Sequence, residues 1–179
     1  SEGRAAVETR GLYGYIDLSG RDLVKASFDE AGPFGNGLAP VKDASNYRAW
    51  GYVDAQGKTI IPHRYNAARA FREGLAPVAT DSRWGYIDVL GRMVLDALYD
   101  EARPFHEGLA AVRGKKGLAY IDKTGTQVFA APYDSALPFH DGLAEVRRKV
   151  KSTNFLGAVF TIVAGTAGQY IYDPLMLDD

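Results

Sequence analysis

The chain has 179 residues, of which 46% are hydrophobic and 24% are charged, and its formal net charge is −1. This composition is typical of a folded domain, and the balanced charge argues against a nucleic-acid-binding protein. There is no cysteine, which excludes thiol catalysis, disulfide bonds and thiolate metal sites. The longest apolar stretch, residues 155–165, is too short to cross a membrane as a helix, so no transmembrane segment is expected.

A motif recurs along the chain at a nearly constant interval. Its fullest copy is residues 83–91, Arg-Trp-Gly-Tyr-Ile-Asp-Val-Leu-Gly. The central tyrosine of the motif occurs four times, at intervals of 37, 34 and 34 residues, as Tyr15, Tyr52, Tyr86 and Tyr120. A period in this range indicates a tandem repeat, in which copies of one small unit stack on their neighbours.

The chain begins in the middle of such a unit. Residues 2–7, Glu-Gly-Arg-Ala-Ala-Val, align with residues 107–112, Glu-Gly-Leu-Ala-Ala-Val. We therefore interpret residues 1–10 as a partial repeat, followed by units that start near residues 11, 48, 82 and 116. On this interpretation the repeats cover residues 1–147, and we expect the chain to be a fragment of a longer array.

Each unit is predicted to contain three antiparallel strands. The first covers a Gly-Leu-Ala-x-Val segment such as 74–78, and the second covers a Trp-Gly-Tyr-Ile-Asp segment such as 84–88. The third is the β-branched or aliphatic run that follows, such as 59–61, which a proline then ends. In the remainder of the unit, such as 133–139, prolines forbid a long helix. We expect an irregular crossover there, with at most one helical turn.

The turn between the second and third strands repeats an Asp-x-x-Gly pattern. The aspartates are Asp17, Asp54, Asp88 and Asp122. An aspartate at the first turn position accepts a backbone N–H two residues on, and the glycine supplies the positive φ that joins a type I turn to a G1 bulge. A row of carboxylates can also bind calcium. Because a turn requires the paired glycine and a metal site does not, we interpret these aspartates as turn caps and expect no cofactor.

Residues 148–179 break the repeat pattern. We predict two strands around a Gly-rich turn at 165–168, which cap the end of the array, since terminal repeats are often atypical. A vestigial further repeat is the alternative.

The Trp-Gly-Tyr-Ile-Asp motif, with Phe-x-Glu-Gly-Leu-Ala-x-Val before it, resembles the WG repeat, a short β-rich bacterial repeat. The resemblance covers about residues 1–147 and departs from the pattern at Tyr13, which replaces the tryptophan, and at Leu118 and Ala119, which replace Trp-Gly. It implies an all-β tandem array of units of about 34 residues. It also implies an extracytoplasmic or envelope-associated binding module rather than an enzyme. We expect the array to be elongated, with a closed propeller as the alternative arrangement.

No catalytic, phosphate-binding or dinucleotide-binding motif is present in the sequence. The function that we predict is binding of another macromolecule, most simply a protein, because repeat arrays offer long binding surfaces. The candidate contact residues vary between units or lie in the extra loop of the longest unit: Tyr47, Arg48, Arg72, His106 and His140.

A metal site is the second possible interpretation of the two histidines. His106 and His140 occupy equivalent positions and are followed by Glu107 and Asp141, a combination that could indicate a zinc or acid–base site. The same positions hold other residue types in the remaining units, as exposed loop positions do. We therefore do not expect a metal site here.

An aromatic row supports the alternative function, carbohydrate or peptidoglycan binding. Tyr13, Trp50 and Trp84 occupy equivalent positions, and a row of open ring faces would bind sugars through their apolar C–H surfaces. Such a row is more often part of a core, because burying an aromatic ring contributes on the order of 2 kcal/mol.

Overall fold

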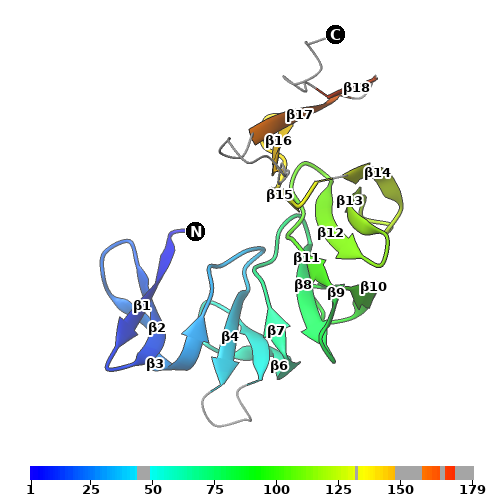
Figure 1. Ribbon diagram of the computed structural model, residues 1–179. Coiled ribbons are helices and arrows are strands. Elements are labelled where there is room, and N and C mark those ends of the chain that lie inside the picture. Colours follow the sequence, from blue (N-terminus) through cyan, green and yellow to red (C-terminus); the bar gives the residue numbers. More distant parts are fainter. Residues whose placement is uncertain (44–48, 132, 148–158, 166–167, 172–179) are drawn as a thin grey trace, which may run out of the picture. The chain divides into compact units, whose positions relative to one another are not determined.

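The computed structural model describes residues 1–43, 49–131, 133–147, 159–165 and 168–171, the last two ranges by their backbone alone (Figure 1). These residues form strands, bridges and turns, with no helix among them, which confirms the predicted all-β fold. The chain divides into two compact units, Ser1–Leu98 and Tyr99–Asp179, and each is described by itself.

The first unit contains two sheets, in which each strand lies beside the next along the chain. The first sheet has six strands: β1 (Arg4–Thr9), β2 (Leu12–Asp17), β3 (Asp22–Ala31), β4 (Ala39–Asp43), β5 (Trp50–Val53) and β6 (Thr59–Tyr65). The second sheet has four strands: β7 (Ala67–Ala68), β8 (Leu75–Thr80), β9 (Arg83–Asp88) and β10 (Met93–Tyr99).

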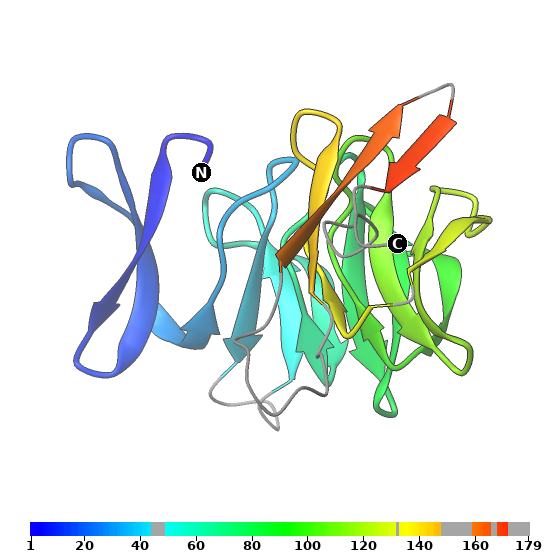
Figure 2. The same ribbon diagram turned by 45° about the horizontal axis from the view of Figure 1, so that its top comes forward.

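The second unit contains two four-stranded sheets. One consists of β11 (Glu101–Ala102), β12 (Ala110–Gly114), β13 (Gly117–Ile121) and β14 (Gln127–Ala131). The other consists of β15 (Ser135–Ala136), β16 (Leu143–Arg147), β17 (Val159–Gly165) and β18 (Gly168–Ile171). Figure 2 shows β17 and β18 side by side, and their register is antiparallel. They continue the sheet that β15 and β16 form, and their role as a cap stays a prediction.

Each repeat supplies the three predicted strands, but two details differ from the prediction. Pro62 does not end the third strand, since β6 continues through it to Tyr65, and the crossover is not irregular throughout. Instead of a helical turn, it begins with a short strand that pairs with the first strand of the following repeat, as β7 pairs with β8. In the long strand β3 the two parts are continuous: its beginning pairs with β2 and its end with β4. The backbone N–H and C=O groups of the crossover are thus hydrogen-bonded to the following repeat, whereas in a helical turn they would pair with one another.

Each hydrophobic cluster is shared between successive repeats. The buried tyrosine and phenylalanine of one repeat contact the Ala-x-Val segment of the next. The clusters contain Tyr15 and Phe34 with Ala39, Val41 and Val53; Tyr52 and Phe71 with Ala76, Val78 and Ile87; and Tyr120 and Phe139 with Ala144 and Val146. One repeat therefore cannot bury its own core, which explains why the Tyr-Ile and Ala-x-Val motifs recur together.

The buried tyrosine closes its own repeat by a ring contact and a hydrogen bond. Tyr52 packs on Phe71 with ring centroids 4.9 Å apart, and its hydroxyl donates to the Arg69 carbonyl at 2.8 Å. Tyr15 makes the same bond to Gly32 at 2.8 Å and Tyr120 to Leu137 at 2.7 Å. Burial raises the pKa of all three tyrosines, that of Tyr120 to about 12, so the hydroxyls stay protonated donors.

The glycine of the Trp-Gly pair lies against the backbone of the third strand. A Cβ on Gly14, Gly51 or Gly85 would lie 2.4, 2.7 or 2.5 Å from a carbonyl oxygen of that strand. At the first two positions the strand register also shifts, as in a bulge. In the last repeat, where Ala119 replaces the glycine, the register is regular from Leu118 to Tyr120. This explains why that departure from the motif is compatible with the fold.

Candidate functional site

The aromatic row proposed for sugars is half-buried rather than open. Trp50 packs against the core cluster around Tyr52, and the guanidinium carbon of Arg69 lies 4.8 Å from the centre of the Trp84 ring. Tyr13 is half-buried as well, and its hydroxyl donates to Glu8 at 3.3 Å. The rings of Trp50 and Trp84 therefore already make contacts within the fold.

The Asp-x-x-Gly segments form the predicted capped turns. In each, one aspartate oxygen accepts the backbone N–H groups two and four residues on, at 2.8–3.0 Å. The pKa of Asp88 is lowered, mainly by the N–H of Arg92, and that of Asp122 mainly by the hydroxyl of Thr124. The carboxylates therefore act as the predicted turn caps, and this geometry gives no support to the calcium interpretation.

The segment before each first strand is a two-residue hairpin. Its central residues both have positive φ: 51° and 77° at Asn36 and Gly37, and 52° and 78° at Glu107 and Gly108. This is the type I′ geometry of tight hairpins, and the sequence analysis did not predict it. The signal was present, because Asn-Gly, Glu-Gly and Asp-Gly pairs recur at these positions.

These hairpins are linked to one another within each unit. The side chain of one hairpin accepts the glycine N–H of the next: Glu2 from Gly37 at 3.2 Å, Asn36 from Gly74 at 3.1 Å, and Glu107 from Gly142 at 2.8 Å. A glutamate in the left-handed region is unfavourable by itself, and this hydrogen bond offsets part of that cost.

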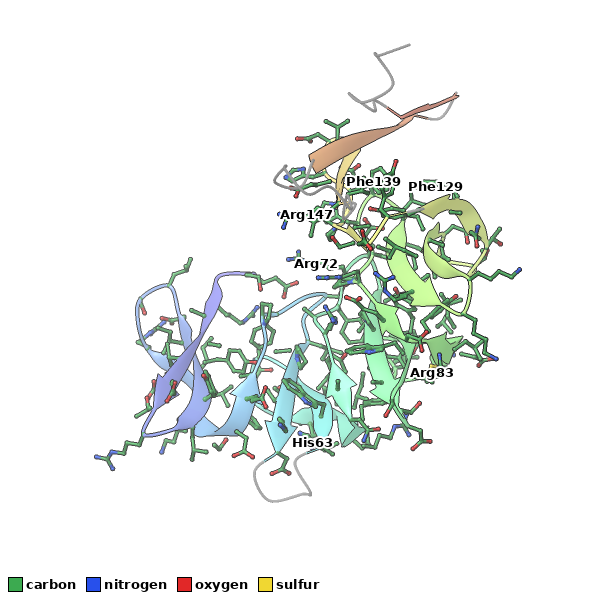
Figure 3. All side chains as sticks on the ribbon, in the orientation of Figure 1. His63, Arg72, Arg83, Phe129, Phe139 and Arg147 are labelled. Carbon is green, nitrogen blue, oxygen red and sulfur yellow. The ribbon has the colours of Figure 1, made fainter. Side chains whose placement is uncertain are left out.

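Three of the predicted contact residues occupy one position of these hairpins. Each of them forms an isolated β-bridge with the leucine three residues later, just after the turn. The pairs are Arg72 with Leu75, His106 with Leu109 and His140 with Leu143, and Gly35 pairs with Leu38 in the same way. Arg72, labelled in Figure 3, and His140 are exposed, and His106 is half-buried. In the second unit the rings of His106 and His140 lie 5.7 Å apart. The other two predicted residues, Tyr47 and Arg48, lie outside the described residues.

An exposed apolar patch was not predicted. It lies on the β9–β10 hairpin and consists of Val89, Leu90, Met93, Val94 and Leu98, which we call the β9–β10 patch. Leu90 and Leu98 are 69% and 68% exposed. The signal in the sequence was a run of aliphatic residues where the other repeats have mostly polar ones, for example Thr59 and Gln127 at the position of Met93.

Together, the sheets and their shared clusters define an all-β tandem-repeat protein. A family model for the WG containing repeat matches residues 13–47, 50–83, 84–118 and 119–149. The chain belongs to this family, which confirms the resemblance found in the sequence. No helix in the described part of the chain has the length and hydrophobicity needed to span a membrane.

Among solved structures, the chain is similar to one titled "Crystal structure of the eukaryotic initiation factor", with a TM-score of 0.55 and 12% identity. The match covers 91% of this chain and 48% of that one, so the chain corresponds to about half of that protein's length. At this identity the likeness concerns the fold. The search of curated proteins gives no match.

Proposed function

We propose that the chain is a non-enzymatic module that binds another protein. The observation that carries the proposal is the β9–β10 patch. Five large aliphatic side chains within ten residues are exposed there, including Val94 at 46% and Met93 at 42%. Exposed apolar side chains gathered on one hairpin are typical of protein-binding surfaces, because a partner that covers them removes them from water.

Leu90, Met93 and Leu98 are particular to this repeat and are not required by the repeat fold. Val94, in contrast, has an exposed aliphatic counterpart in each of the other repeats: Leu23, Ile60 and Val128. At the position of Leu90 the other repeats have Ser19, Gln56 and Thr124, and at the position of Leu98 the first two have Ser27 and Arg64. The same turns and strands form with these polar residues. A role outside folding therefore accounts best for the apolar residues.

The patch also lies on the last strand of its sheet. β10 pairs with β9 on one side, and the order of the described sheet places no further strand beyond it. Edge strands present backbone donors and acceptors together with their side chains. An extended apolar segment of a partner fits such a surface, by the mode in which a peptide adds a strand to a sheet.

The test exchanges the patch for the residues of other repeats. The triple variant Leu90→Gln, Met93→Thr and Leu98→Ser carries residues that this fold already accepts at equivalent positions. Wild-type chain and variant are used to capture proteins from the native cell, and each captured protein is then titrated directly by calorimetry. We expect a partner that binds the wild type and binds the triple variant at least tenfold more weakly.

The matched control is Leu18→Ser, which removes one exposed leucine outside the patch and should leave binding unchanged. Equal binding of the partner by wild type and triple variant would show that the patch is not the interface. Absence of any partner, together with turnover of a substrate, would contradict the non-enzymatic role itself.

Two further expectations belong to this proposal. Arg72, His106 and His140 stay candidate contacts at the hairpin side of the repeats. The extracytoplasmic or envelope location implied by the family resemblance is testable by fractionating the native cell. The half-burial of Tyr13, Trp50 and Trp84 weighs against the carbohydrate alternative.

A further inference from the structure

The hairpins that precede β12 and β16 bring together three metal-ligating side chains. One ligand atom from each of Glu107, His140 and Asp141 lies within 4.8 Å of the other two. His140 Nδ1 is 3.5 Å from the Asp141 carboxylate, close to the roughly 3.3 Å that separates two ligands of a tetrahedral zinc ion. In the part of the chain that the structure describes, this is the one such cluster.

Two of the ligands are held by the hairpins. Glu107 and Asp141 both have φ of 52°, as the first central residue of a type I′ turn does. The Glu107 carboxylate also accepts the N–H of Gly142 at 2.8 Å, which positions it beside the second hairpin while its other lone pairs stay available. A cation would therefore meet one carboxylate that is already oriented.

A second imidazole borders the cluster. The ring of His106 lies 5.7 Å from that of His140, and its buried Nδ1 has no hydrogen-bond partner among the described residues. The hairpins thus gather two imidazoles and two carboxylates, which the sequence analysis had assigned to separate exposed loops.

We propose that Glu107, His140 and Asp141 form a binding site for a divalent transition-metal ion such as Zn²⁺, with water completing the coordination. One nitrogen and two carboxylate oxygens suit zinc, whereas calcium and magnesium prefer oxygen ligands alone. The site is independent of the β9–β10 patch, so either proposal can fail without the other.

The first unit contains a natural comparison. Its corresponding hairpins have Asn36 in place of Glu107, and Arg72 and Glu73 in place of His140 and Asp141. The hydrogen bond from one hairpin to the next is present there too, from Gly74 to Asn36. Because an amide and a guanidinium replace a carboxylate and an imidazole, this pair of hairpins should not bind the ion.

The experiment is a ZnCl₂ titration of the full chain followed by the imidazole C–H signals in proton NMR. The chain has three histidines and no cysteine, so each imidazole is resolved and no thiolate competes. We expect the His140 signals to change and saturate at one equivalent of Zn²⁺, and those of His63 to stay constant. Added EDTA should reverse the change.

Variants separate this site from nonspecific binding. Because His140→Ala also removes the reporting imidazole, Zn²⁺ binding by the variants is measured by calorimetry: His140→Ala should abolish the saturable binding of one equivalent, Asp141→Asn should weaken it, and His63→Ala should leave it unchanged. The His140 and Asp141 side chains are 81% and 92% exposed, so these changes should not disturb folding, which the urea midpoint checks. Replacing the first unit's residues by Asn36→Glu and Arg72→His should add a second equivalent of bound Zn²⁺.

No saturable response in the wild type would overturn the proposal. Unchanged calorimetric Zn²⁺ binding by His140→Ala, or a response of the His63 signals equal to that of His140 in the wild type, would overturn it as well, since the ion would then bind elsewhere.

Discussion

At the scale of single residues, the buried tyrosine hydroxyls tie each second strand to the crossover of its repeat. Tyr52→Phe removes the donor to the Arg69 carbonyl at 2.8 Å and leaves a partly buried acceptor without that partner. We expect the free energy of unfolding to fall by about 1–3 kcal/mol, as measured by urea denaturation. The control is Tyr13→Phe, whose exposed hydroxyl bonds only weakly to Glu8 and whose loss should cost under about 0.5 kcal/mol. Equal effects of the two changes would contradict this assignment.

The glycine of the Trp-Gly pair has a steric role, because it lets the third strand approach closely. In Gly85→Ala the new Cβ would lie 2.5 Å from the Leu95 carbonyl oxygen, which the neighbouring strand can relieve only by moving its backbone. We expect a loss of about 1–3 kcal/mol, measured as a shift of the denaturation midpoint. The reverse change, Ala119→Gly in the repeat with regular register, should cost no more than about 1 kcal/mol. If Gly85→Ala proved neutral, close backbone approach would not explain the motif.

At the scale of elements, the capped turns make the stability of the fold depend on pH. The pKa values of Asp17, Asp88 and Asp122 lie below the ordinary value of 3.8 in the folded chain, because turn hydrogen bonds favour the carboxylate. Their contribution is therefore present above about pH 4 and is lost as pH falls through the lowered values. Asp122→Asn keeps an acceptor but cannot titrate, so the difference between its urea midpoints at pH 7 and pH 3 should be smaller than in wild type. An unchanged difference would exclude a contribution from this turn.

The strand that carries the Trp-Gly pair gives a test of the carbohydrate alternative. Trp50 and Trp84 are the two tryptophans of the chain, and both are half-buried. We expect their fluorescence to lie to the blue of the water limit, with weak iodide quenching and no change on adding peptidoglycan fragments. Emission at the water limit that such fragments shift would restore the carbohydrate function.

At the scale of the whole molecule, the sequence predicts an elongated array. A compact chain of 179 residues has a radius of gyration of about 16 Å. Small-angle scattering should give a larger value and an asymmetric distance distribution. A value near the compact one would favour the closed propeller arrangement instead.

The sequence by itself determined the all-β class, the repeat period and the capped turns. These features depend on local chemistry: the spacing of Tyr15, Tyr52, Tyr86 and Tyr120, and the pairing of each turn aspartate with its own glycine. Propensity and turn geometry act over a few residues, so a linear sequence displays them directly.

Only the tertiary structure decided how the repeats share their cores and which side chains reach the surface. Tyr52 and Trp50 are two residues apart on one strand, yet one is fully buried and the other half-exposed. The cluster of Glu107, His140 and Asp141 likewise joins residues more than 30 positions apart, through a hydrogen bond between two hairpins. Such contacts depend on the register between repeats, which spacing in the sequence does not specify.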